Sequence, residues 1–306
     1  MSDALGRILV TGASGQLGSY LLRELDSRGL AATAWSRRPN VELFGFQCQS
    51  VDLGKVDEVV SAFEDAKPDV VLHAAAMSSV GACFRDPEQA RRINATATDL
   101  LARLAEQQSA RFVHISTDLV FDGTKPWYVE TDCPAPLSVY GHTKAEAERR
   151  VRHCSNHLVL RISLLFGPSL NQRPSFFQQQ IESLRNDVPC ILFQDEWRTP
   201  LSLDVAASGV LAAAASEASG TLHLGGSERM SRLEMGQRLA RVMEKDERLC
   251  QAALRDDVNS PEPRPRDTAL SSTLWERTIR GFKRPRYEDC LYAMGLGTYP
   301  NGLTKP

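Results

Sequence analysis

The sequence predicts an α/β fold, a doubly wound parallel sheet with a smaller, discontinuous C-terminal α/β substrate domain. Short apolar runs rich in Val, Ile and Leu alternate with longer amphipathic runs, which is the pattern of βα units. The strand runs have almost no polar interruption, which is typical of strands buried on both faces. These two features together indicate a parallel sheet between two layers of helices.

The N-terminal half supplies most of the predicted sheet. RILVTG is apolar and short, as a strand should be, and the amphipathic run after it ends at Gly29, a common helix stop. The expected elements are strands at 7–12, 30–35, 46–52, 70–76, 111–117 and 157–163, and helices at 15–29, 55–66, 87–108 and from Tyr140 to about His153.

The pattern loosens after Gly167. One helix is expected at 174–187, the runs 202–216 and 221–226 indicate a return to the sheet layer, and another helix is expected from Ser231. A Pro/Arg-rich loop and a charged tail with few strand signals follow. The predicted domains are therefore 1–165 with about 200–226 for cofactor binding, and about 166–199 with 227–306 for substrate binding.

Composition limits the classes of function. The 306 residues carry 36 basic and 38 acidic side chains, a net charge of −2, which argues against a nucleic-acid or anionic-membrane partner. The seven cysteines lie far apart without a C-x-x-C pair, so neither a metal site nor a disulfide framework is expected, and a reducing cytoplasm is favoured. No run is long and apolar enough to predict a membrane span or a signal sequence.

A glycine triplet follows the first strand directly. TGASGQLG places Gly12, Gly15 and Gly18 three apart where a helix opens. The glycines allow a tight turn, close approach of backbone N–H groups to a pyrophosphate, and close helix–strand packing, so the motif predicts a Rossmann dinucleotide site. The other predicted contacts of this loop are Ser14, Gln16 and Leu17.

The second strand ends with Ser36, Arg37 and Arg38, where an NAD site usually has a carboxylate for the ribose 2′-hydroxyl. Guanidinium groups can instead bind a 2′-phosphate, so NADP(H) is favoured over NAD(H). Two solvent-exposed arginines at a strand end are the alternative. Asp52, next to Leu53, is expected to cap the following helix or to meet the adenine amino group.

Tyr140 and Lys144 lie four residues apart in VYGHTKAEAE. Residues at this spacing are neighbours on a helix, so the phenol and the ammonium can converge on one point. The alternative is an ordinary helix start after Pro134 and Pro136. A nearby ammonium would favour the phenolate and lower the pKa of the tyrosine, which is useful in acid–base chemistry.

These motifs, together with the AAA run at 74–76, Asn94 and HISTDLVFDG at 114–123, occur in the order seen in extended short-chain dehydrogenases/reductases. The chain resembles the dTDP-4-dehydrorhamnose reductase branch, which also includes the methionine adenosyltransferase β subunit. The resemblance implies that Tyr140 donates a proton to a carbonyl and that Thr117 binds the substrate oxygen. It also implies that Lys144 and the residues Ala74, Ala75, Ala76 and Asn94 serve the cofactor site, with Asn94 supporting the lysine through the helix. A mid-helix asparagine that faces solvent is the alternative for Asn94.

The resemblance further implies that Arg264 and Arg266 bind the diphosphate of a nucleotide sugar, unless the loop is simply solvated. His73 and Leu119 depart from the usual residues, and these changes are expected around the substrate. The leading hypothesis is an NADP(H)-dependent reductase of a nucleotide-activated keto sugar. A catalytically silent regulatory subunit and a sugar-nucleotide epimerase or dehydratase are the alternatives, and a homodimer is left open.

Overall fold

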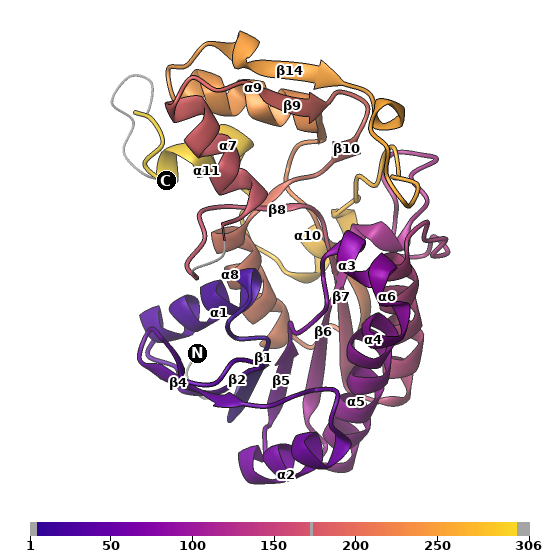
Figure 1. The fold of residues 1–306 in the computed structure, drawn as a ribbon. Helices are drawn as coiled ribbons and strands as arrows, with labels where there is room; N and C mark the ends of the chain where they lie inside the picture. Colours follow the sequence, from indigo (N-terminus) through magenta and orange to yellow (C-terminus); the bar gives the residue numbers. More distant parts are fainter. Residues whose placement is uncertain (1–4, 172–173, 299–306) are drawn as a thin grey trace.

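The computed structural model describes residues 5–171 and 174–298, which form a large sheet carrying a smaller body at one end (Figure 1). The sheet has eight strands in the order β12-β7-β6-β5-β1-β2-β4-β3, and only the edge strand β3 is antiparallel to its neighbour. This is the predicted doubly wound arrangement, so the fold class is confirmed. The strands are β1 (Ile8–Thr11), β2 (Ala32–Ser36), β3 (Val41–Leu43), β4 (Phe46–Ser50), β5 (Val70–His73), β6 (Arg111–Thr117), β7 (His157–Ile162) and β12 (Gly220–Leu224).

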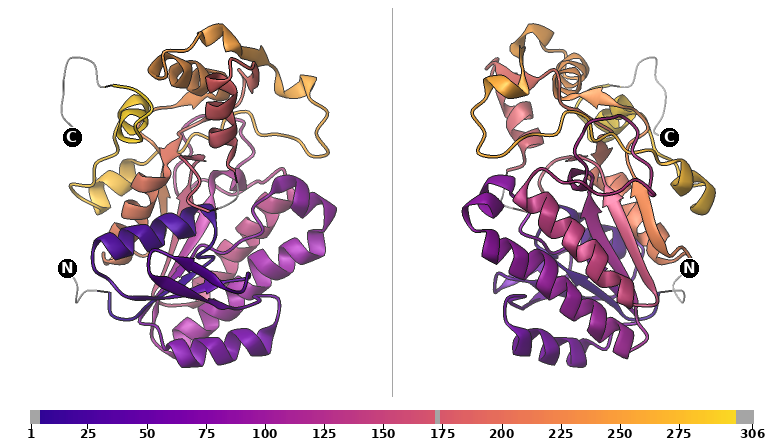
Figure 2. Two further views of the ribbon diagram at one scale, coloured as in Figure 1. Left: turned by 60° about the vertical axis from the view of Figure 1, so that its left-hand side comes forward. Right: turned by 90° about the vertical axis from the view of Figure 1, so that its right-hand side faces the viewer.

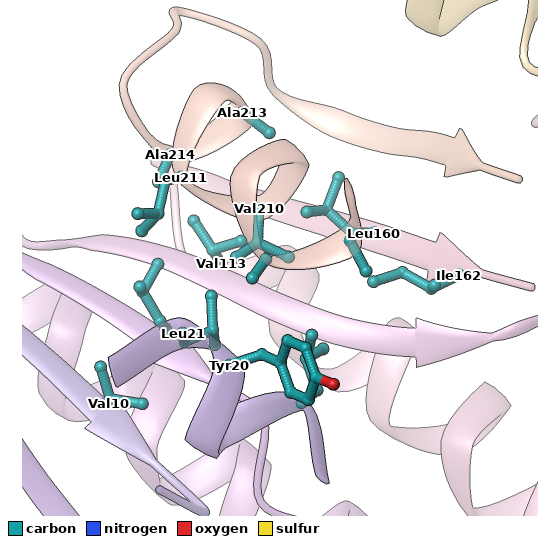
Figure 3. Packing of buried hydrophobic residues seen from close by; sticks show 14 of the residues in the cluster. Val10, Tyr20, Leu21, Val113, Leu160, Ile162, Val210, Leu211, Ala213 and Ala214 are labelled. Carbon is teal, nitrogen blue, oxygen red and sulfur yellow. The ribbon is translucent and has the colours of Figure 1, made fainter. Parts of the chain in front are cut away.

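Helices cover both faces of the sheet because successive strand residues point to opposite sides. Figure 3 shows one face, where Tyr20 and Leu21 of α1 (Gln16–Ser27) and Val210 and Leu211 of α8 (Leu203–Ala214) lie against strand residues such as Val10 and Leu160. The opposite face packs against α2 (Val56–Ala66) and α5 (Ala97–Gln107) through alternate strand residues such as Leu9 and Val71. The sheet is therefore buried on both faces.

The smaller body lies beyond the carboxyl ends of the strands (Figures 1 and 2). A separate apolar cluster holds it together, including Phe177, Met235 and Leu291. Its elements are β8 (Leu165–Phe166), α7 (Phe176–Arg185), β9 (Cys190–Phe193), β10 (Trp197–Arg198), β11 (Leu201–Ser202), β13 (Met230–Ser231), α9 (Arg232–Val242), β14 (Cys250–Ala253) and α11 (Tyr287–Ala293). Helix α10 (Thr273–Thr278) packs back against the sheet layer.

Three features differ from the expected elements. The predicted helix at 87–108 is α4 (Pro87–Arg91), a π-helical turn η2 (Arg92–Thr96) and α5. The short strands of the smaller body, including β14 paired with β9, were not expected, because runs of two to four residues carry little periodicity. The predicted strand at 70–76 ends at His73, which leaves the three alanines in a loop at the sheet edge.

The domain boundaries and the cytoplasmic location of the protein remain predictions. All seven cysteines are free. Within 5–171 and 174–298, no helix has both the length and the apolar character needed to cross a bilayer, and no cluster of His, Cys, Asp and Glu is arranged to hold a metal ion.

Candidate active site

A cavity of about 770 Å³ opens at the carboxyl ends of the strands, and residues of the smaller body such as Phe176 also line it. Ligands of doubly wound sheets bind at this edge, and the volume is in the ordinary range for a ligand site. Most of the predicted site residues line it, namely Gly12, Ser14, Gly15, Gln16, Leu17, Arg37, Arg38, Asp52, Leu53, Ala74, Ala75, Ala76, Thr117, Tyr140 and Lys144.

The glycine loop lines this cavity at the start of α1. Gly12 has φ +69°, a conformation that L side chains rarely adopt, and a Cβ there would lie 2.6 Å from the backbone of Ala75. A Cβ on Gly18 would lie 2.1 Å from the carbonyl oxygen of Gly12, whereas one on Gly15 would lie 3.0 Å from it. Gly15 is the N-cap and has no side chain to satisfy the first N–H groups of the helix. These groups fit a pyrophosphate.

The two arginines lie beside the glycine loop at the end of β2. The Nη2 of Arg38 lies 3.4 Å from the carbonyl oxygen of Ser14, and the Ser36 hydroxyl donates to the Ser14 hydroxyl at 2.9 Å. Asp52 does not cap α2, whose N-cap is Lys55. Its carboxylate instead accepts from the Gly54 N–H at 2.9 Å and stabilises the turn before the helix.

Tyr140 reaches the cavity from the first turn of α6 (Val139–Arg150). Ser138 caps this helix by accepting from the Gly141 N–H, which fixes Tyr140 one residue inside the helix. Burial raises the pKa of Tyr140, although its hydrogen bond with Thr117 acts in the opposite direction. The expected lowering of this pKa by Lys144 is therefore not what the structure gives. The phenol stays protonated, which is the form that can donate a proton.

Lys144 lies one turn further along α6 and is almost fully buried. Its Nζ donates to the Ile115 carbonyl at 2.6 Å and lies 3.1 Å from Nε2 of His114. Burial lowers the pKa of Lys144 to about 7, partly offset by the charge of Glu148. The ammonium thus lies next to a neutral ring, because burial and the charge of Lys144 hold the pKa of His114 well below its usual value.

Asn94 lies behind the cavity and is not among the residues that line it, so its expected service to the cofactor site is through the helix of Lys144 and not by direct contact. Its side-chain amide accepts from the Met77 N–H at 2.8 Å and donates to the Thr143 hydroxyl at 3.0 Å. The alternative that Asn94 faces solvent is wrong, because the residue is fully buried. Asn94 therefore ties the loop after β5 to the residue before Lys144.

His73 is also fully buried and does not line the cavity, so the expectation that it borders the substrate is wrong. Its ring lies between the hydroxyls of Thr11 and Thr98, at 2.7 and 2.8 Å. Leu119, the other departure, does line the cavity.

Arg264 and Arg266 lie outside the lining of the cavity. Arg264 donates to Glu196 at 2.9 and 3.0 Å and lies over the ring of Phe193. Glu196 also pairs with Arg198 at 3.5 Å. Arg266 is exposed, and its backbone carbonyl accepts from the Trp197 N–H at 2.7 Å.

Residues 6–295 match the model of the RmlD substrate binding domain. The chain belongs to this family. It is 31% identical over 289 residues to the probable low-salt glycan biosynthesis reductase Agl14 of Haloferax volcanii, covering 93% of this chain and 96% of that protein. It is 29% identical over 306 residues to the methionine adenosyltransferase 2 subunit beta of Pongo abelii, covering 91% and 84%.

The fold of this RmlD-family chain also matches a solved dTDP-4-dehydrorhamnose reductase of Bacillus anthracis in complex with NADP. The TM-score is 0.84 at 22% identity, and the match covers 95% of this chain and 99% of that structure. The resemblance drawn from the motifs is therefore confirmed.

Several cavity residues of this family member were not predicted. Ser163, Leu164 and Leu165 follow β7, and their place after a strand could have indicated a position at the ligand edge. Asp86 and Phe176 also line the cavity, but nothing in their local sequence distinguishes them from ordinary helix-start residues.

Proposed function

We propose that this protein is an NADP(H)-dependent reductase of a nucleotide-activated keto sugar. The observation that carries the proposal is the convergence of Thr117, Tyr140 and Lys144 on the cavity that also contains the glycine loop. The reductase names of relatives such as Agl14 support the same class of reaction. Nucleotide sugar and cofactor are the partners that this proposal requires.

Tyr140 is the proposed general acid. Its phenol is protonated by virtue of its raised pKa and lies next to Thr117, whose hydroxyl would hold the substrate carbonyl oxygen close to it. When bound, the nicotinamide would supply the hydride. Lys144 would bind the nicotinamide ribose and stabilise the phenolate that remains after proton transfer.

The preference for NADP(H) rests on Arg37 and Arg38. Both line the cavity beside the glycine loop, and no carboxylate pairs with either of them within the described ranges. A 2′-phosphate would therefore meet two guanidinium groups that have no competing charge partner. NAD(H) would leave both without an anion.

Arg264 is the proposed diphosphate contact on the substrate side, with Arg266 beside it. Arg264 already pairs with Glu196, so a diphosphate would have to share or replace that carboxylate. We keep Arg266 in the proposal because it is exposed and follows Arg264 by two residues.

A regulatory subunit is the second candidate, favoured by two observations. The match to the methionine adenosyltransferase 2 subunit beta extends over most of both chains. Leu119, which has no polar group, borders the cavity directly after the Thr117-Asp118 pair. A regulatory protein of this kind would bind NADPH without consuming it.

The test is a panel of keto sugar nucleotides offered with NADPH, with the loss of NADPH absorbance as the readout and the Tyr140→Phe protein as the blank. Oxidation with one class of sugar supports the reductase. Tight NADPH binding without oxidation across the panel would favour the regulatory candidate, and sugar conversion without net NADPH loss would favour an epimerase or dehydratase.

A further inference from the structure

His114 lies directly behind the catalytic pair and carries a polar atom that finds no partner. The residue is on β6, is completely buried, and belongs to none of the cavity-lining residues. Its Nδ1 has no hydrogen-bond partner among the described residues. A buried donor or acceptor left in this state destabilises a fold, so its presence requires an explanation.

The strand register brings His114 into line with two other polar residues. Thr11 of β1 pairs with His73 of β5, and His73 pairs with His114 of β6. The rings of His73 and His114 are stacked with their centres 5.4 Å apart. The Nε2 of His114 lies 3.1 Å from Nζ of Lys144.

The contact with Lys144 determines which nitrogen of His114 carries the proton. When Lys144 is charged, its ammonium has donors only, so Nε2 of His114 is then the unprotonated acceptor. The proton is then on Nδ1, the nitrogen without a partner. His73 does not supply a partner for Nδ1 of His114, because both ring nitrogens of His73 are bonded to the hydroxyls of Thr11 and Thr98.

We propose that His114 is a positioning residue that fixes the ammonium of Lys144 in the cofactor site, at the cost of its own unsatisfied Nδ1–H. Two of the three N–H groups of Lys144 are held, by His114 and by the Ile115 carbonyl. A four-carbon side chain that would otherwise sample many rotamers thus presents its remaining N–H in one place. The role assigned to Lys144 rests on the proposed function.

Among the residues that the structure describes, no carboxylate forms an ion pair with Lys144. The charged or titratable groups that act on Lys144 are Glu148 on its own helix, His114 on β6 and His73 on β5, and Tyr140 lines the same cavity. Glu148 is engaged elsewhere, since it pairs with Arg161 at 2.7 Å and accepts from the Ser116 hydroxyl at 2.5 Å. His114 is therefore the side chain that holds Nζ.

Two variants separate positioning from simple packing. His114→Phe keeps a ring against His73 but removes the acceptor, whereas His114→Gln keeps an acceptor within reach of Nζ. The first readout is the pKa of Lys144 in ligand-free protein, measured by NMR of ¹³C-labelled lysine. The Lys144→Arg protein, which lacks the Lys144 signal, identifies that signal in the spectrum. The second is the NADPH dissociation constant, and the third is the thermal unfolding midpoint.

For His114→Phe we expect the Lys144 pKa to fall below its value of about 7, because the charged form loses an acceptor. NADPH should bind about 10-fold more weakly, as expected for a lost charge-assisted hydrogen bond. The unfolding midpoint should be unchanged or higher, because an unsatisfied donor is removed. His114→Gln should restore the titration and most of the affinity. His114→Leu provides a second acceptor-free variant should the phenylalanine not fit.

His223→Phe is the matched control. This histidine is also fully buried and bonded to its neighbours, but it lies away from Lys144, with its Nε2 3.2 Å from Arg161. Its replacement should lower stability without moving the Lys144 titration. An unchanged titration in His114→Phe, or a His114→Gln protein as impaired as His114→Phe, would overturn the inference. The titration needs neither cofactor nor substrate, so failure of the wild type to bind NADPH would refute the proposed function alone.

Discussion

Positive charge is arranged differently around the cavity and within the smaller body beside it. The cations that line the cavity, Arg37, Arg38 and Lys144, have no carboxylate partner among the residues that the structure describes. On the side of the smaller body, the arginines share buried carboxylates; the group comprises Arg198, Arg232 and Arg264 with Glu196 and Asp118. An anion can bind the first group without displacing any ion pair, but at the second it competes with groups already in place.

This difference separates two ways of building an anion site. Lys144 is almost fully buried, so its charge raises the free energy of the ligand-free protein, whereas Arg37 is exposed and hydrated and is simply available to an anion. The paired arginines hold the smaller body in shape before any ligand arrives. Affinity for the cofactor should therefore depend on single residues, whereas affinity for the substrate should be spread over a network.

The largest expected effect is the loss of proton donation by Tyr140→Phe. We expect kcat to fall by about 10²–10⁴-fold, the usual contribution of general acid catalysis, with NADPH affinity nearly unchanged. Steady-state kinetics and calorimetry would check both quantities. Tyr287→Phe is the control, because Tyr287 is buried in the smaller body and donates to the Met235 carbonyl. Wild-type turnover by Tyr140→Phe would remove the catalytic assignment.

The unpaired charge of Lys144 predicts a pH-dependent stability. The pKa of Lys144 is about 7 in the folded protein and 10.5 for an unperturbed lysine, so between these values the unfolded state binds the proton and the folded state does not. Stability therefore rises with pH through this window, and the penalty is complete below it. Lys144→Met should be more stable than wild type by up to a few kcal/mol below pH 7, with the advantage shrinking toward pH 10. Urea unfolding at both pH values measures this, and equal stability throughout would contradict a buried, uncompensated lysine.

Cofactor discrimination should come next in size. Arg37→Ala combined with Arg38→Ala should remove most of the preference for NADPH over NADH, worth about 1–3 kcal/mol for charge-assisted contacts. Titrating both cofactors into wild type and variant gives the ratio. Arg28→Ala is a suitable control, because Arg28 is a surface arginine at the far end of α1 that pairs with Glu24. If the wild type binds both cofactors equally well, the arginines do not read a 2′-phosphate.

The smallest expected effect concerns the paired arginines of the smaller body. Arg264→Ala should raise the substrate KM only several-fold, because the remaining arginines around Glu196 can move toward the vacated position. Arg266→Ala is the matched comparison two residues away, without an ion pair in the described part of the chain. An Arg264→Ala effect as large as that of Tyr140→Phe would show that substrate binding, too, depends on one residue. No change of KM in the double variant would remove both arginines from the substrate site.

The cavity residues and the arginine network also differ in how well the sequence predicts them. Gly12, Thr117, Tyr140 and Lys144 each occupy a local pattern, a strand end or a helix turn, and the structure brings all four to one cavity as expected. The arginine network was out of reach, because Glu196 meets partners up to 68 residues away and no local spacing encodes such a contact. The same holds for Asn94, whose two contacts lie 17 and 49 residues away in sequence.

The π-helical turn η2 changes the direction in which side chains point along the continuous helical segment formed by α4, η2 and α5. A π-helical turn has i→i+5 hydrogen bonds in place of the i→i+4 bonds of an α-helix, so it adds one residue to the helix. Each residue of an α-helix turns the chain by about 100°, so the side chains after η2 are rotated by about that angle relative to an uninterrupted helix. Asn94 lies on this turn and Thr98 just after it, which lets one face Thr143 while the other meets His73. The alignment of Asn94 and Thr98 with their partners therefore depends on the number of residues in η2 as well as on their identity. We expect deletion of a single residue other than Asn94 from 92–96 to restore a regular α-helix and to rotate Asn94 and Thr98 relative to each other, so that both can no longer meet their partners.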